Sequence, residues 1–226
     1  EKNITPRTKA IVVPHLWGRF CDMDRLKNIC KKSKQKIYLI EDASHCFGAK
    51  YKNQFLGTLG DVGIFSLQAG KPLVAGEGGI LVTDNYQICD AAMYLGHYER
   101  IRFNKNTKYK DYARTGGGYK FRMHQLAAAL ALAQLQGIRS KLKKHNELMA
   151  YFEDKLDKLH SALVLKRSYS DFEYGGRFGL RIAIDMSLKY KQNFIDRCIK
   201  KGLFVEDEYV PLLHLEKFFI EHNAKN

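Results

Sequence analysis

The sequence predicts an α/β protein built on a largely parallel sheet. An apolar run over residues 10–14 is typical of a buried strand, a helical pattern follows over residues 22–34, and a second strand pattern covers residues 36–40. Two parallel strands require such a helical crossover, and ligands of parallel sheets lie at the carboxyl ends of the strands. With 226 residues and 45% hydrophobic content, the chain can bury a core.

The next segment extends the sheet. Glycines and alternating polar residues over 48–60 predict a short hairpin or an irregular excursion, and residues 62–67 are strand-like. A further strand over 80–83 follows the Gly78–Gly79 turn, and a helix follows over 86–95.

The second half of the chain is predicted to be mainly helical. Residues 99–117 are polar and basic, a loop long enough that function or disorder must explain it. From Met123 to about Leu159 the pattern predicts one helix, with a buried first half, because alanine and leucine surround it, and an exposed polar face on its second half. Strands at 163–165 and 178–184 and a helix at 192–201 then begin a second α/β unit.

Composition argues against several classes of protein. The net charge of +14 permits attraction to anions, but most of it is dispersed lysine, and the densest cluster, residues 139–144, is typical of a solvated helix face. We therefore expect no nucleic-acid partner. The five cysteines form no CxxC pair, which indicates neither a disulfide framework nor a metal site.

The chain also lacks the marks of a membrane or secreted protein. No run approaches the roughly 20 apolar residues that span a bilayer, and residues 1–9 are polar, unlike a signal segment. We expect a cytoplasmic protein that does not bind membranes.

A lysine in a distinctive context points to chemistry. Ser66 precedes Lys71 by five residues, a glycine-rich turn follows at residues 76–79, and Asp42 ends an earlier strand. A pyridoxal phosphate site needs a lysine amine for a Schiff base, an acid facing the pyridine nitrogen, and donors to the phosphate. The sequence therefore predicts pyridoxal 5'-phosphate as the cofactor.

The order and spacing of these motifs resemble the DegT/DnrJ/EryC1/StrS family of pyridoxal phosphate-dependent sugar aminotransferases. The resemblance covers nearly the whole chain, from Thr8-Lys9-Ala10 through the long helix. It rests on the Glu41-Asp42-Ala43 segment, on the F-S-x-x-x-x-K pattern that ends at Lys71, and on residues 118–123.

The resemblance implies a role for four residues. Asp42 would pair with the protonated pyridine nitrogen, and His45 would donate to the phenolic oxygen of the cofactor. Ser66 would donate to the phosphate, and Lys71 would carry the cofactor and move the substrate proton. The plainer alternatives are a strand-capping aspartate, a structural histidine and an exposed lysine.

Residues 118–123 resemble a G-x-N-x-R-M segment that reaches the phosphate of a neighbouring subunit, which implies a homodimer with shared active sites. Lys120 replaces the asparagine of that motif and can bind phosphate as a point charge. Arg122 keeps its place, either as a cofactor contact or as a structural residue at the start of a helix.

Gln68 and His97 are candidates for substrate binding. The segment from Gln68 to Lys71 and residues 120–126 look more like the branch that aminates keto-cyclitols of the scyllo-inosose type and related keto-sugars than the nucleotide-sugar branch. His97 corresponds to the R-x-H-G loop of the family, although Tyr98 stands where glycine is usual.

The resemblance implies a fold type I three-layer sandwich. We expect residues 1–137 to be part of the cofactor-binding large domain, and residues 138–226 to be a linking helix and part of a small C-terminal α/β domain. The family pattern is longer at both ends, so we expect a fragment of the family's chain.

The implied activity is transfer of an amino group from glutamate or glutamine to a keto-sugar or keto-cyclitol. The alternative is a catalytically degenerate interaction or sensor module with the same fold.

Overall fold

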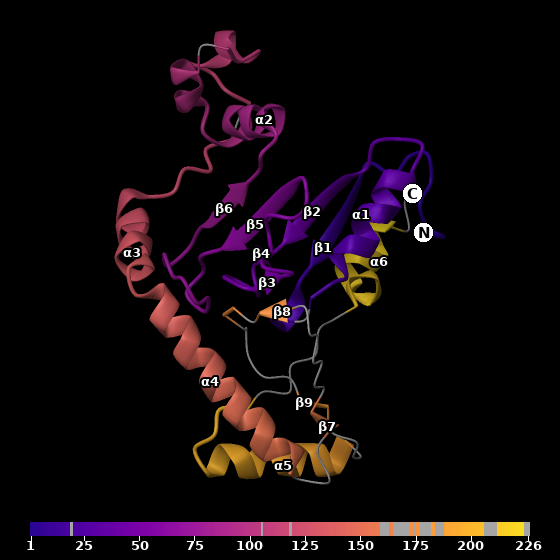
Figure 1. Cartoon of the computed structure of the whole chain (residues 1–226), viewed down its shortest axis with the longest axis vertical. Helices are drawn as coiled ribbons and strands as arrows, with labels where there is room; N and C mark the ends of the chain where they lie inside the picture. The colour runs from indigo at the N-terminus through magenta and orange to yellow at the C-terminus, as the bar shows by residue number, and fades with distance from the viewer. Residues whose placement is uncertain are drawn as a thin grey trace. The chain divides into compact units, whose positions relative to one another are not determined.

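The structure, a computed structural model, describes residues 1–18, 20–104, 106–117, 119–158, 163–164, 172–173, 175–176, 182–183, 188–205 and 212–223 (Figure 1). It divides into two compact units. The first comprises Glu1–Leu159 and Val164–Ile182, and the second comprises His160–Leu163 and Ala183–Asn226. The first unit holds every residue that we predict for the site.

The main sheet of the first unit has four strands, β1 (Ala10–Pro14), β2 (Tyr38–Asp42), β5 (Val62–Ser66) and β6 (Gly79–Val82), in the order β1-β2-β5-β6. The first three are parallel, and β6 runs antiparallel to β5. The predicted α/β fold is confirmed.

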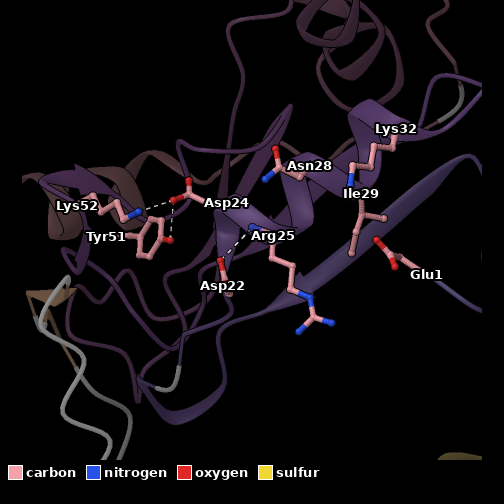
Figure 2. A pocket seen from close by; sticks show the side chains of 9 residues that line it. All are labelled: Glu1, Asp22, Asp24, Arg25, Asn28, Ile29, Lys32, Tyr51 and Lys52. Atoms are coloured by element: carbon pink, nitrogen blue, oxygen red, sulfur yellow. Dashed lines mark hydrogen bonds and ion pairs between the residues drawn. The ribbon is translucent and has the colours of Figure 1, made fainter.

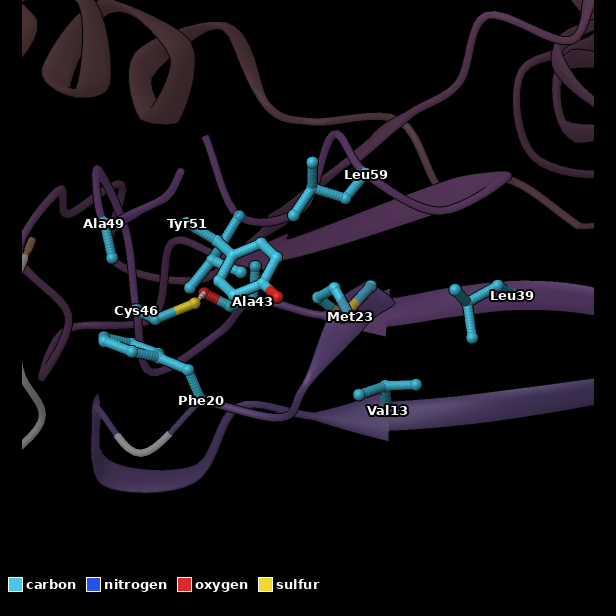
Figure 3. Packing of buried hydrophobic residues seen from close by; sticks show 10 residues of the cluster. Val13, Phe20, Met23, Leu39, Ala43, Cys46, Ala49, Tyr51 and Leu59 are labelled. Carbon is cyan, nitrogen blue, oxygen red and sulfur yellow. Dashed lines mark hydrogen bonds between the residues drawn. The ribbon is translucent and has the colours of Figure 1, made fainter. Parts of the chain in front are cut away.

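Helix α1 (Met23–Lys32) connects β1 to β2. Asp22 caps its first turn by accepting the amide hydrogen of Arg25 at 3.0 Å, and lysines lie in the last turn, where they complement the helix dipole. Met23 packs into a core with Val13, Leu39 and Phe20 (Figure 3). Burial on this side of the sheet fixes which face of β2 points inward.

A small hairpin follows, made of β3 (Lys50–Tyr51) and β4 (Gln54–Phe55). Lys52 and Asn53 between them have positive φ angles of 47° and 64°, as a two-residue hairpin turn requires. The predicted hairpin is confirmed. A third strand, β8 (Phe172–Glu173), pairs with β3.

The predicted loop over residues 99–117 contains short helices. After α2 (Tyr86–Gly96) come two 3-10 helices, η2 (Tyr98–Phe103) and η3 (Lys110–Tyr112). The buried carboxylate of Asp90 accepts hydrogen bonds from Asn104 and from the hydroxyl of Thr107. These bonds fasten the segment to α2.

The prediction of a single helix from Met123 to about Leu159 is wrong. The structure has two helices there, α3 (Gln125–Leu135) and α4 (Ile138–Asp157). Gly137 forms the N-cap of α4 with a non-helical φ and ψ of −99° and 2°.

The burial expected for the first half of that helix is also wrong. Ala127 and Ala131 pack against the cluster around Leu67, whereas Leu126 and Leu132 are 76% and 65% exposed. A helix that is apolar all round buries only the face that a neighbour covers.

The remaining elements are short strands and helices. They are β7 (Leu163–Val164), β9 (Ile182–Ala183), α5 (Leu188–Lys200), η4 (Leu213–Leu215) and α6 (Lys217–Asn223). β7 pairs with β9, and α5 confirms the predicted helix near residues 192–201. Most of the strand predicted at 178–184 lies outside the described residues. Across the described ranges, none of the helices combines the length and the apolar character that a bilayer crossing needs.

Candidate active site

The loop that carries Lys71 is closed at its base. It leaves β5 at Leu67, whose amide donates to the carbonyl of Gly78 at 2.9 Å and whose carbonyl accepts the amide of Ala75 at 2.8 Å. Within the loop, the amide of Lys71 donates to the carbonyl of Gln68 at 2.9 Å. Leu67 is fully buried. Its packing and its hydrogen bonds to Gly78 and Ala75 therefore hold the base of the loop that carries Lys71.

Asp42 and Ser66 project from the same face of the sheet. Asp42 ends β2 and pairs with Ile64 on β5, and Ser66 lies two residues beyond Ile64. Residues two apart on a strand, and paired residues on neighbouring strands, share a face. The carboxylate and the hydroxyl thus lie near each other at the carboxyl ends of adjacent parallel strands.

The charge of Asp42 acts on Lys71. Burial lowers the pKa of the Lys71 amine below its usual value, and the negative charge of Asp42 offsets part of that decrease. Opposite charges that interact in this way favour the protonated amine. A lowered pKa makes the neutral, nucleophilic amine more available at neutral pH.

The side chains of Ser66, Gln68 and Asp42 each accept a hydrogen bond from a backbone amide. The hydroxyl oxygen of Ser66 accepts the amide of Gln68 at 3.3 Å, so the hydroxyl hydrogen can turn toward an anion. The side-chain oxygen of Gln68 accepts the amide of Gly70 at 2.8 Å, which folds this side chain along its own loop. Asp42 Oδ1 accepts the amide of Ser44 at 3.0 Å.

His45 follows β2 and contacts the segment after β1. Its Nδ1 accepts the backbone amide of Trp17 at 3.3 Å. Trp17 has φ 52° and ψ 32°, a left-handed conformation that is uncommon for a bulky residue and is often found at functional sites.

His97, Lys120 and Arg122 form a second group. Arg122 donates to Glu99 at 2.6 Å, and the ammonium of Lys120 lies 6.0 Å from the ring centre of Tyr98. Burial lowers the pKa of His97, and the positive charges of Arg100 and Arg122 lower it further. The two contacts hold Arg122 and Lys120 against residues 99 and 98, which directly follow His97. Gly118 of the predicted motif lies outside the described residues.

The sequence reasoning missed a buried pair behind the site, Glu41 and His15. Both side chains are fully buried, and His15 Nε2 lies 3.1 Å from Glu41 Oε2. Because side chains alternate along β2, Glu41 points into the core while Asp42 points to the opposite face. A charged residue at a core-facing strand position was the available signal, since such a group needs a buried partner.

Glu41 also gathers three backbone amides. Gly57 donates to Oε2 at 2.9 Å, and Leu59 and Gly60 donate to Oε1 at 2.6 Å each. Burial by itself raises the pKa of Glu41, but the hydrogen bonds from His15 and from these amides outweigh burial and hold the pKa below its usual value of 4.5. Glu41 is therefore ionised at neutral pH.

Gly63 shows how closely the amide-bearing segment lies against the sheet. A Cβ on Gly63 would lie 1.7 Å from the carbonyl oxygen of Gly57, so only glycine fits on β5 at this point.

A surface hollow of about 560 Å³ lies elsewhere, beside α1 (Figure 2). Asp24 in it is already engaged, accepting from the hydroxyl of Tyr51 at 3.0 Å and from Lys52 at 2.6 Å. The full lining is Glu1, Asp22, Asp24, Arg25, Asn28, Ile29, Lys32, Tyr51 and Lys52. None of the predicted site residues is among them.

We also considered thiols and metal ligands among the described residues. Cys46 is buried, which raises the pKa of its thiol and keeps it protonated. Among the residues that the structure describes, no group of three histidine, cysteine or acidic side chains could hold a metal ion.

The chain is similar in sequence to several known proteins. GDP-perosamine synthase of Escherichia coli O157:H7 is 31% identical over 159 residues, which are 70% of this chain and 42% of that protein. A Micromonospora echinospora protein provisionally named L-glutamine:3-amino-2,3-dideoxy-scyllo-inosose aminotransferase is 37% identical over 135 residues, 60% of this chain and 31% of its own length.

Solved structures share the fold. Spr1654 of Streptococcus pneumoniae, provisionally described as a sugar aminotransferase, matches in its apo form with a TM-score of 0.78 and 25% identity, over 98% of this chain and 59% of its own. The same protein is also solved in a PLP form. The fold is therefore the predicted fold type I α/β architecture.

The chain spans about a third to three fifths of the length of these proteins. The family model described as "DegT/DnrJ/EryC1/StrS aminotransferase family" matches residues 1–226. This match extends over the strands, the Lys71 loop and the 97–122 segment. The chain belongs to the DegT/DnrJ/EryC1/StrS aminotransferase family, whose members depend on pyridoxal phosphate.

Proposed function

We propose that this chain carries the lysine-bearing half of a pyridoxal phosphate-dependent aminotransferase that moves an amino group from glutamate or glutamine to a keto-sugar or keto-cyclitol. The observation that supports this most is the position of Asp42 and Ser66 at the carboxyl ends of β2 and β5, with Lys71 on the loop that follows β5. Membership in the family supports the reaction class.

The residues of the site fit the cofactor chemically. Lys71 offers a partly buried amine of lowered pKa, and Asp42 offers a carboxylate whose charge acts on it. Ser66 offers a hydroxyl hydrogen, because its oxygen already accepts from Gln68. When bound, pyridoxal phosphate supplies an electron sink for the carbanion formed when the substrate loses its α proton.

In this proposal each residue has a defined role. Lys71 holds the cofactor and then carries the proton between carbon atoms. Asp42 faces the ring nitrogen and favours its protonated form, Ser66 donates to the phosphate, and His45 donates to the phenolic oxygen.

The substrate side is assigned to Gln68 and His97. The side-chain amide of Gln68 keeps its two N–H donors, because its oxygen carries the bond to Gly70. Such donors suit the hydroxyl groups of a sugar or cyclitol. Burial lowers the pKa of His97, the charges of Arg100 and Arg122 lower it further, and both effects favour the neutral ring.

We assign Lys120 and Arg122 to the phosphate site of a second copy of the chain. Their contacts in this chain are with Tyr98 and Glu99, close to their own segment. Exposed apolar groups nearby, Phe121 on this segment and Leu126 and Leu132 on α3, give a second copy a surface to bury.

Incubation of the chain with pyridoxal phosphate, followed by borohydride reduction and peptide mapping, tests the cofactor assignment. We expect labelling at Lys71 to exceed labelling at the exposed α1 residue Lys31 at least tenfold. The lowered pKa and the phosphate donors favour Lys71 over a solvated lysine.

The mapped position decides between the outcomes. Equal labelling of Lys71 and Lys31 contradicts the proposed site. Specific labelling of Lys71 with no amino transfer to any keto-sugar or keto-cyclitol supports the interaction or sensor module in place of the enzyme.

Replacement of the α3 leucines tests the homodimer. We expect L126K together with L132K to turn a dimer into a monomer in sedimentation velocity, because two charges replace apolar contacts between copies. F204K, at a residue that is 91% exposed on the second unit, is the control and leaves the dimer intact. A wild-type chain that is monomeric at tens of micromolar disproves the homodimer.

A further inference from the structure

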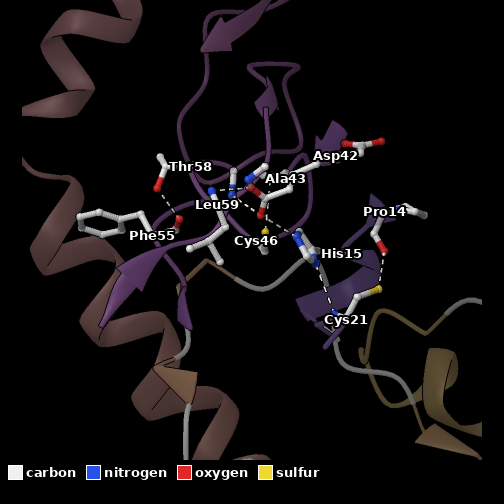
Figure 4. Close-up of polar contacts among 12 residues, drawn as sticks. Pro14, His15, Cys21, Asp42, Ala43, Cys46, Phe55, Thr58 and Leu59 are labelled. Carbon is white, nitrogen blue, oxygen red and sulfur yellow. Dashed lines mark hydrogen bonds and ion pairs between the residues drawn. The ribbon is translucent and has the colours of Figure 1, made fainter. Parts of the chain in front are cut away.

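His15 connects three parts of the molecule behind the site. It directly follows β1, its side chain is fully buried, and its backbone amide donates to the carbonyl of Asp42 at 3.0 Å. Its Nε2 lies 3.1 Å from Glu41 Oε2. Its Nδ1 accepts the backbone amide of Cys21 at 3.4 Å (Figure 4). One residue therefore contacts the end of β2 twice and closes the turn between β1 and α1.

The two ring bonds fix the proton on His15. Because Nδ1 accepts an N–H, the hydrogen of the neutral ring is on Nε2, where it donates to Glu41. Loss of the Glu41 carboxylate leaves the Nε2–H group unpaired, and loss of Nδ1 leaves the amide of Cys21 unpaired. An unpaired buried polar group lowers the stability of the fold. The ring orientation is thus set from both sides.

The segment that follows His15 also contacts His45. Trp17 lies two residues after His15, and its amide donates to His45 Nδ1 at 3.3 Å. The neutral His45 ring then also carries its hydrogen on Nε2. His45 therefore presents a donor, and not an acceptor, at its outer nitrogen.

We propose that His15 is a positioning residue of this site: its backbone amide binds the carbonyl of Asp42, and its ring, through Cys21 and Trp17, sets His45 as an Nε2–H donor. Asp42 and His45 are assigned to the cofactor, so this inference rests on the proposed function. His15 itself is on the core side of β2 and acts only through its neighbours.

Two substitutions of His15 separate positioning from packing. In H15N the side-chain oxygen can take the place of Nδ1 and accept from Cys21, but the bond to Glu41 is lost. In H15Q the amide nitrogen can take the place of Nε2 and donate to Glu41, but the acceptor for Cys21 is lost. If His15 had only a structural role, the effects of H15N and H15Q on the site would follow their losses of folding stability and nothing else.

Amide exchange and ring-nitrogen NMR on the chain without cofactor test the proposal. We expect the Trp17 amide to exchange at least tenfold faster in H15Q and within threefold of wild type in H15N. His45 in the wild-type chain is expected in the Nε2–H form, and H15Q is expected to populate both forms. H214Q, an exposed histidine of the second unit, is the control and changes neither readout.

The outcomes are decisive in both directions. Trp17 exchange in H15Q within twofold of wild type, or a hydrogen on Nδ1 of His45 in the wild-type chain, overturns the proposal. If H15Q does not fold, C21P removes the same hydrogen bond from the other partner and carries the same expectation. Because no cofactor is present, a failure of the proposed function leaves these results unaffected.

Discussion

Replacement of Lys71 by alanine is expected to lower the rate of amino transfer by at least about 10³-fold. Proton transfer by a positioned side chain contributes about 10² to 10⁴-fold, and loss of the amine also removes the covalent step. The measurement is the turnover number for amination of a keto-sugar or keto-cyclitol with glutamate or glutamine as donor. The fold should persist, because Lys71 lies on a loop whose base is held by Leu67.

Arginine at the same position provides the sharper variant. K71R keeps a positive charge near Asp42, but a guanidinium stays protonated and cannot act as a nucleophile. We expect K71R to be as inactive as K71A, and K31A on α1 to retain full activity. More than a tenth of wild-type turnover in K71R would show that charge, and not an amine, is what the reaction needs.

Replacement of Glu41 by glutamine is expected to lower the free energy of unfolding at pH 7 by about 1–3 kcal/mol, the usual cost of leaving a buried hydrogen-bond donor without its acceptor. The carboxylate accepts from three backbone amides and lies beside His15. An amide nitrogen in place of one oxygen leaves some of these donors facing another donor. Urea denaturation measures the change, with E147Q on the exposed face of α4 as the matched control.

The effect of E41Q depends on pH in a defined sense. The pKa of Glu41 is lower in the folded chain than its usual value of 4.5. Its contribution to stability is therefore complete above pH 4.5 and is lost as the pH falls through the folded pKa. The difference in unfolding free energy between wild type and E41Q should shrink below pH 4.5. A difference that stays constant from pH 7 to pH 3 contradicts the assigned ionisation.

Local patterns predicted the elements of the first unit well. Apolar runs located β1, β2 and β5, and the helical pattern over residues 22–34 located α1. Pairing over long sequence distances could not be predicted. The strand at Phe172–Glu173 is two residues long, so its place beside β3 depends on tertiary contacts and not on periodicity. The break at Gly137 was lost because helical patterns continue on both sides of it.

Sequence reasoning selected the candidate residues of the site, because their chemistry is distinctive at that spacing. It placed Asp42, Ser66 and Lys71 correctly at strand ends and on the following loop. Their catalytic and binding roles stay predictions, as do those of His45, Gln68, His97, Lys120 and Arg122. The domain boundary at residue 137 also stays a prediction. His15 and Glu41 were missed because their roles come from burial and from amides more than ten residues away.

The closed loop around Lys71 has a consequence for repeated turnover. A lysine that releases its bound partner must find it again before the next cycle begins. Both ends of this loop are hydrogen-bonded, at Leu67 with Gly78 and with Ala75, so the backbone of Lys71 stays in place. In the role that we propose for Lys71, this return needs only rotations of one flexible side chain, which keeps the effective concentration of the amine high at the reacting carbon. Recapture is then an intramolecular event in every cycle.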